Sequence, residues 1–138
     1  MSLRRPYRFP IAEWSRLRDR SFLAQQLGHL EICGVFGITR KNEIRLYFIP
    51  NRTKQPYAFE IHRCDMIRME KLVARSSIQV SGTFHSHPVS EAVLSPNDYA
   101  KGFYRNHQMI YDVCGEELVI WQRAQFSGKL TKMGFLVY

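Results

Sequence analysis

The stretch Gly82–Asp98, which reads GTFHSHPVSEAVLSPND, constrains the fold of this chain more than any other segment. A β-like run over Ile78–His87 ends there in two histidines, His85 and His87. Side chains two positions apart on a strand point to the same face. Ser95–Asp98 is typical of a helix start, because serine is a favoured N-cap, proline suits the first helical position and an acidic residue suits a capping box. We therefore expect a strand end and a helix start to lie close together.

The remaining pattern mixes helices with runs of strands. Apolar residues at helical spacing predict helices over 12–31, 65–75 and 96–106, and Gly34 is expected to mark the end of the first. Apolar runs predict further strands over 33–39, 43–49, 56–62, 108–114, 117–122 and 130–138. We expect an α/β fold (mixed α+β) with a central, mixed and largely antiparallel β-sheet flanked by helices. No repeat or linker interrupts the pattern, so residues 1–138 are expected to form a single domain.

Composition narrows the class of protein. The chain has 138 residues, of which 45% are hydrophobic, enough for one domain with its own core. No apolar run is long enough to span a membrane, and the N-terminus lacks the apolar region of a secretion signal. The three cysteines, Cys33, Cys64 and Cys114, lie far apart and are expected to be small buried thiols. These features predict a cytoplasmic protein without a membrane segment.

The charge is strongly positive, with a formal net charge of +8 and many arginines within residues 1–20. Such a region can meet nucleic acid or an acidic protein, and it can also be a solvated basic surface. Because no recognised nucleic-acid-binding signature accompanies it, nucleic-acid binding is disfavoured.

The two histidines and Asp98 together predict a metal site. Two imidazoles and one carboxylate are three protein ligands, and zinc sites of that kind with an open fourth position are the catalytic type. Such a site also needs a base and a donor that hydrogen-bonds the oxyanion. Ser95 is a candidate for the donor. Spacing alone leaves the base open between Glu91 and the other glutamates. It also leaves open whether Asp98 is a ligand or only a partner of the helix cap.

One arrangement of motifs resembles a known family. His85-Ser86-His87-Pro88, then seven residues, then Ser95-Pro96-Asn97-Asp98, resembles the JAMM motif of the JAB/MPN zinc metalloproteases. The segment Glu31–Gly37, EICGVFG, is similar to the helix-to-strand corner of that family, and Pro50-Asn51 resembles its loop after the second strand. The resemblance covers roughly residues 12–138, and the length is that of the short prokaryotic members.

This resemblance implies a role for each matched residue. His85, His87 and Asp98 would bind one Zn2+ per chain, Glu31 would be the general base and acid, and Ser95 would hydrogen-bond the oxyanion. The implied activity is that of a zinc isopeptidase or peptidase. Its implied substrate is the C-terminal glycine tail of a ubiquitin-like or sulfur-carrier protein.

Several expectations stay open beside this one. The alternatives are a non-catalytic MPN-type scaffold and a nucleic-acid-associated JAB-like protein. The chain is expected to be a monomer or a homodimer, and the loop 89–94 is a candidate flap over the substrate.

Overall fold

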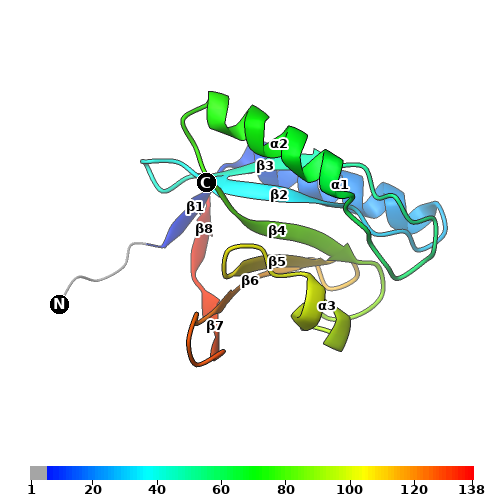
Figure 1. Ribbon diagram of the computed structural model, residues 1–138. Helices are drawn as coiled ribbons and strands as arrows, with labels where there is room; N and C mark the ends of the chain where they lie inside the picture. The colour runs from blue at the N-terminus through cyan, green and yellow to red at the C-terminus, as the bar shows by residue number, and fades with distance from the viewer. Residues whose placement is uncertain (1–5) are drawn as a thin grey trace.

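A computed structural model describes residues 6–138 of the chain (Figure 1). The arrangement mixes strands and helices, as expected from the sequence. In chain order the elements are β1 (Tyr7–Phe9), α1 (Ile11–Gln26), β2 (Cys33–Ile38), β3 (Ile44–Ile49), α2 (Arg63–Arg75), β4 (Val80–His87), α3 (Pro96–Lys101), β5 (His107–Asp112), β6 (Glu117–Arg123), β7 (Leu130–Met133) and β8 (Phe135–Val137).

The main sheet has six strands in the order β3-β2-β4-β5-β6-β7. Only β4 and β5 pair in parallel, whereas every other neighbouring pair in this sheet is antiparallel. The expectation of a mixed, largely antiparallel sheet is therefore confirmed. Separately, β1 pairs in parallel with β8, which joins the two ends of the described chain.

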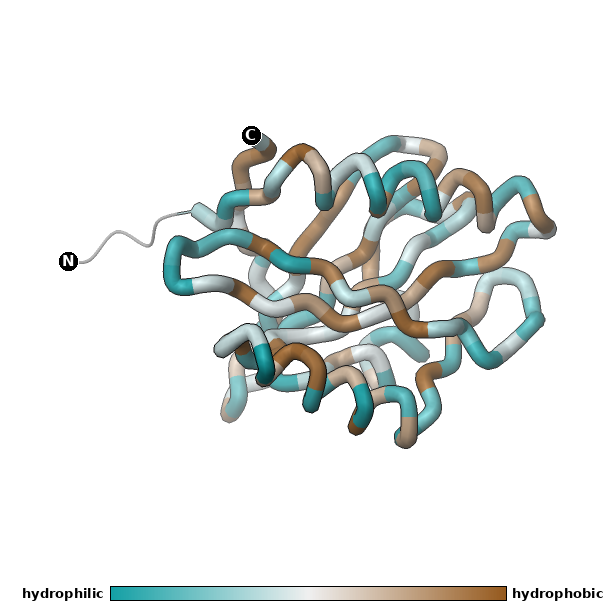
Figure 2. Tube along the Cα trace, turned by 90° about the horizontal axis from the view of Figure 1, so that it is seen from above, coloured by the Kyte–Doolittle hydropathy of each residue, from teal (hydrophilic) through white to brown (hydrophobic). Residues whose placement is uncertain are grey.

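The two faces of the sheet are covered by different helices. On one face Leu17 of α1 packs with Phe36, Phe84 and other residues of the largest core cluster. On the other face Val73 of α2 packs with Val35 and with neighbours from β3 and β4. Figure 2 shows strongly hydrophobic segments recurring along the strands that lie between the helices. Because strand side chains alternate, His85 and His87 lie on the opposite face from Phe84, which is the α2 face.

The first predicted helix is too long, and its expected end at Gly34 is wrong. Helix α1 ends at Gln26, and the chain then turns through Gly28, whose φ of 121° suits a residue without Cβ. Gly34 lies inside β2 instead. A Cβ there would collide with the backbone carbonyl of Tyr47 on β3 and come within 2.6 Å of the ring of Phe84, so only glycine fits between the two. Glu31 is consequently in the corner between α1 and β2 and not at a helix end.

The strand predicted over 56–62 is also wrong. This segment lies outside the sheet, because Tyr57 has a φ of 60° and its ring stacks on that of His29. The amide of Asn51 holds the segment instead, donating to the carbonyl of Ala58 and accepting from the N–H of Glu60.

The remaining differences from the predicted elements concern where helices and strands end or are interrupted. The helix predicted over 96–106 stops at Lys101, and Gly134 divides the strand predicted over 130–138 into β7 and β8. Strand β1 was not predicted. Of the three cysteines, Cys33 is buried as expected, whereas the other two are exposed. Within residues 6–138, no helix combines the length and the apolar character needed to cross a membrane.

Candidate metal centre

The end of β4 and the start of α3 bring His85, His87 and Asp98 together. The Nε2 atoms of the two histidines are 3.1 Å apart. Asp98 Oδ1 lies 3.2 Å from Nε2 of His85, and Asp98 Oδ2 lies 3.0 Å from Nε2 of His87. A tetrahedral zinc ion with bonds of about 2.0–2.1 Å separates its ligand atoms by about 3.3 Å. The three side chains thus have the chemistry and the spacing of a metal ligand set, and all three are buried.

The protein orients both imidazole rings. Nδ1 of His87 lies 2.7 Å from the backbone carbonyl of Glu91 and donates to it, and Nε2 faces Asp98. When Nε2 loses its proton, it offers a lone pair to a metal while Nδ1 stays protonated. The ring of His85 stacks on Phe59 with ring centroids 4.4 Å apart and planes 22° apart. Nδ1 of His85 is buried without a hydrogen-bond partner among residues 6–138. Each ring is therefore fixed with Nε2 directed at the same point.

Asp98 serves the helix and the cluster at once. The Ser95 side chain accepts a hydrogen bond from the N–H of Asp98, and the N–H of Ser95 donates to Asp98 Oδ2, each over 3.0 Å. This reciprocal pair is a capping box at the start of α3. The same Oδ2 contacts His87, so capping does not exclude a ligand role. Behind the helix, the buried side chain of Gln108 donates to the backbone carbonyl of Asp98.

Burial and proximity shift the protonation of the three groups. Burial acts to raise the pKa of Asp98, but hydrogen bonds from both histidines outweigh it and hold this pKa well below its usual range. Burial lowers the pKa of His85. For His87, burial acts in the same direction, but its contacts with Asp98 and the Glu91 carbonyl prevail and raise the pKa. The carboxylate is thus the stable anionic member of the cluster, as a metal ligand must be.

Glu31 lies beside this cluster and is held from two directions. Its backbone carbonyl accepts a hydrogen bond from the side chain of Asn51. The next residue, Ile32, exchanges two hydrogen bonds with Ser86, which sits between the two histidines on β4. Glu31 is only 7% exposed, and burial raises its pKa to about 7; His87 lowers this pKa and Asp98 raises it further.

The other glutamates do not share this place. A cavity of about 130 Å3 is lined by Glu31 together with His87, Ser95, Asp98 and six neighbours, and no other glutamate lines it. Glu91, the alternative base nearest in sequence, has an exposed side chain and contributes only its backbone carbonyl to His87. Among residues 6–138, Glu31 is therefore the only glutamate that lines this cavity, and its pKa is near neutrality.

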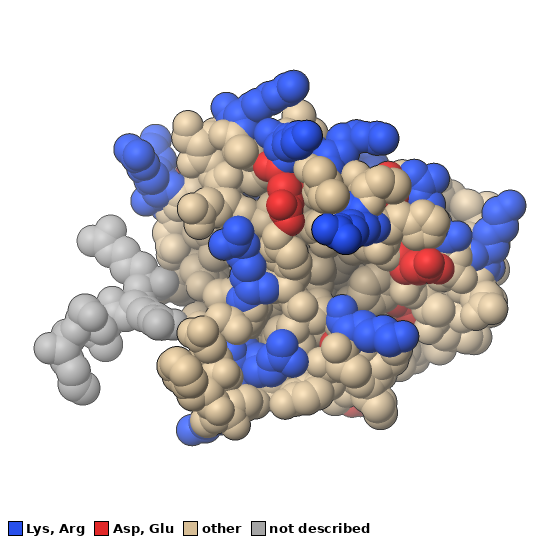
Figure 3. Space-filling view, viewed as in Figure 1, with Lys and Arg blue, Asp and Glu red and all other residues tan. Residues whose placement is uncertain are grey.

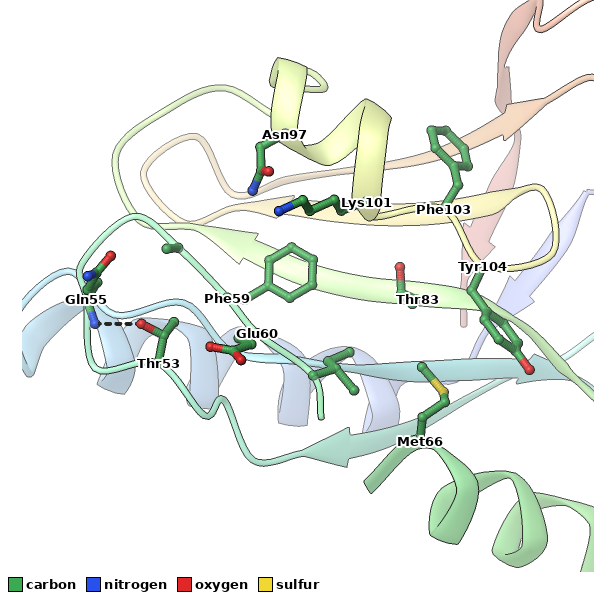
Figure 4. A pocket seen from close by; sticks show the side chains of 12 residues that line it. Thr53, Gln55, Phe59, Glu60, Met66, Thr83, Asn97, Lys101, Phe103 and Tyr104 are labelled. Atoms are coloured by element: carbon green, nitrogen blue, oxygen red, sulfur yellow. Dashed lines mark hydrogen bonds between the residues drawn. The ribbon is translucent and has the colours of Figure 1, made fainter. Parts of the chain in front are cut away.

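A wider groove of about 470 Å3 continues from the cavity, and Ala58, Phe59 and Asn97 line both. Figure 4 shows this groove between the segment that carries Phe59 and Glu60 on one side and α3, with Asn97 and Lys101, on the other. Thr83 lies on the strand behind it. The groove has apolar rings and polar groups together.

The loop 89–94, expected as a flap, is anchored at several points. In addition to the contact of the Glu91 carbonyl with His87, the indole N–H of Trp121 donates to the carbonyl of Ala92 over 3.2 Å. The side chain of Gln25 donates to the carbonyl of Pro88. These contacts fix the wall of the cavity.

The chain was compared with known proteins. A sequence profile of a family described as prokaryotic homologs of the JAB domain matches residues 17–124. No curated protein matches the chain.

Solved structures resemble the fold. A protein from Desulfitobacterium hafniense superposes with a TM-score of 0.78 at 16% identity, over 96% of this chain and 92% of that one. A protein from Salinibacter ruber gives 0.63 at 18% identity, over 95% and 91%. A JAB1/MPN domain protein from Archaeoglobus fulgidus gives 0.57 at 13% identity, over 94% and 98%. At these identities the likeness concerns the fold alone.

Proposed function

The chain belongs to the family of prokaryotic homologs of the JAB domain, and we propose that it is a zinc-dependent peptidase or isopeptidase. Its proposed substrate is the C-terminal glycine tail of a ubiquitin-like or sulfur-carrier protein. The observation that carries the proposal is a cluster of three buried ligand side chains, two of which, His87 and Asp98, line one cavity together with Glu31 and Ser95.

His85, His87 and Asp98 are the residues that would hold the zinc ion. When bound, zinc lowers the pKa of a coordinated water to about 7 and polarises a carbonyl group. Glu31 accepts a proton from the attacking water and returns it to the leaving amine. Its raised pKa suits both halves of this exchange at neutral pH.

Ser95 is the proposed oxyanion donor. Its Oγ already accepts the N–H of Asp98, but a serine hydroxyl keeps its own proton to donate. Ser95 also lines the cavity, so that proton is available to a carbonyl oxygen that gains charge there. The same side chain therefore caps α3 and serves the reaction without losing either interaction.

The proposed substrate class rests on the shape of the site. The cavity at the ligands is small, and it suits a main chain without bulky side chains next to the bond that breaks. The adjoining groove has a larger volume, about 470 Å3, and has residues 58–61 along one wall. Backbone groups of this segment that do not bond Asn51, Arg52 or His29 would be available to the main chain of an extended tail.

The first experiment measures zinc by mass spectrometry in the purified chain after loading and desalting. We expect about one zinc per wild-type chain, none in His87→Ala, and an unchanged content in His62→Ala, because His62 is an exposed histidine that does not line the cavity. Absence of zinc from the wild type would refute a zinc enzyme and favour the scaffold alternative.

The second experiment measures cleavage of a ubiquitin-like domain that ends in Gly-Gly linked by an amide to a fluorophore. We expect cleavage by the zinc-loaded wild type and a loss of at least about 100-fold in Glu31→Gln with zinc retained. Equal cleavage by Glu31→Gln would remove the general base from the proposal.

A further inference from the structure

A second hollow lies on α2, away from the metal centre. Its volume is about 430 Å3, and no residue that lines it lines the metal cavity or the adjoining groove. The floor is apolar and comes from the end of β3, from Met69, which also packs on the core under α2, and from the exposed Leu72: Ile49, Pro50, Met69 and Leu72. The Arg52–Asp65 ion pair lines one end of it. Leu72 is 47% exposed, and it joins Met69, Ile49 and Pro50 in one continuous apolar lining.

The rim of this hollow is cationic. Arg68, Lys71 and Arg75 line it, at helical spacings that place them on one side of α2. None of the three has an ion pair with any residue in the range 6–138. Figure 3 shows Lys and Arg side chains spread over the face that carries α2, with few Asp and Glu side chains between them.

The two acidic residues of α2 do not neutralise this rim. Asp65 is buried and receives two hydrogen bonds from the guanidinium of Arg52, over 2.7 and 2.9 Å. Glu70 accepts a hydrogen bond from the hydroxyl of Tyr104, on the side toward the sheet. Asp65 lines the hollow and also feels the charge of Arg68, but its ion pair with Arg52 balances it. The hollow therefore keeps an excess of positive charge from Arg68, Lys71 and Arg75.

We infer that this hollow is a docking site for an acidic, amphipathic segment of a partner protein. Apolar side chains of such a segment would cover Met69 and Leu72, while its carboxylates would meet the three rim cations. A nucleic-acid backbone would satisfy the cations but leave the apolar floor exposed to water. A second copy of this chain would bring two sets of like charges together. The inference does not depend on the proposed catalytic function.

The test uses the full chain and two labelled synthetic peptides. One has leucines at helical spacing among glutamates, and the other has glutamines in place of the glutamates. We expect the wild type to bind the acidic peptide at least about tenfold more tightly than the glutamine peptide in fluorescence anisotropy. In 1H–15N spectra, the acidic peptide is expected to shift amide signals of α2 and of residues 49–52.

Two double variants with the same change in net charge separate this site from general attraction. Arg68→Glu with Arg75→Glu is expected to weaken binding by at least about tenfold. Lys41→Glu with Lys129→Glu, which alters two exposed lysines outside the hollow, is expected to weaken it by less than about threefold.

Three outcomes would overturn the inference. They are equal binding of the two peptides, equal loss in the two double variants, and spectral shifts that fall elsewhere than on α2. A short DNA duplex that binds at α2 more tightly than the acidic peptide would assign the surface to nucleic acid instead. Metal content and cleavage are expected to be unchanged in both double variants, so a failure here is distinguishable from a failure of the proposed enzyme.

Discussion

Burial of Glu31 predicts that this residue destabilises the metal-free fold at neutral pH. Its carboxyl group is 7% exposed, and its pKa rises from the model-peptide value of 4.5 to about 7 on folding. Between these two values the folded chain holds a proton that the unfolded chain has lost. The free energy of unfolding therefore falls as the pH rises through this window.

The size of the effect follows from the shift. One pKa unit corresponds to about 1.4 kcal/mol, so the charged carboxylate costs the folded state about 3 kcal/mol above pH 7. In Glu31→Gln the group no longer titrates, and this cost disappears. Between pH 5 and pH 8 the stability of Glu31→Gln should rise by about 2–3 kcal/mol relative to the wild type.

The assay is urea unfolding at pH 5, 6, 7 and 8 with a chelator present. The comparison across pH removes any constant cost of burying the glutamine amide. Glu117→Gln is the control, because Glu117 is exposed at the end of β6, and it should show no such trend. A stability difference between Glu31→Gln and the wild type that stays constant from pH 5 to pH 8 would refute the reasoning.

Three further outcomes are expected. Zinc at a hundredfold excess over Kd should stabilise the 138-residue chain by about 2.7 kcal/mol and raise Tm by about 9 °C. Asp98→Asn, which can still cap α3, should show no rise in Tm with zinc. A full rise in this variant would contradict a ligand role for Asp98. Burial raises the pKa of Cys33 to about 12, so a maleimide should label the two exposed cysteines of the native chain and reach Cys33 only after unfolding; rapid labelling of all three would count against this burial. Gly34→Ala should lower the free energy of unfolding by about 1–3 kcal/mol in urea, because its Cβ would collide with the backbone carbonyl of Tyr47 and press on the ring of Phe84. A change below about 0.5 kcal/mol would contradict this close packing.

Local signals predicted most elements of the fold but not how distant parts meet. The alternation of Tyr57, Phe59 and Ile61 has the period of a strand, yet the left-handed backbone at Tyr57 prevents sheet pairing there. Instead of pairing in a sheet, the segment places the ring of Phe59 against the imidazole of His85. Strand β1 has three residues and pairs only with β8, so no local pattern predicts it, whereas β8 lies within the strand predicted over 130–138.

In the candidate site, too, local sequence patterns predicted some residues, whereas the placement of others depends on distant parts of the chain. The spacing of His85, His87 and Asp98 predicted a candidate ligand set but left open whether Asp98 only caps the helix, and the family resemblance assigned it as a ligand. The placement of Glu31 came from the family resemblance, and its physical cause lies in long-range hydrogen bonds through Asn51 and Ser86. Gln108 and Trp121 carried no signal, since a buried amide and an indole acquire their partners only when β5 and β6 join the sheet.

The capping box at Ser95 and Asp98 has a consequence for tracing activity among related chains. These two residues start a helix whether or not a metal is present, so a descendant that lost its chemistry would still lose about 1 kcal/mol by replacing them. Glu31 gives the fold no such benefit, and its burial acts against stability. In such a descendant, neutral mutations would therefore replace Glu31 before they replaced Ser95 and Asp98. An intact Ser-x-x-Asp pair is then a poor marker of a working enzyme, and a buried glutamate facing two histidines is a good one.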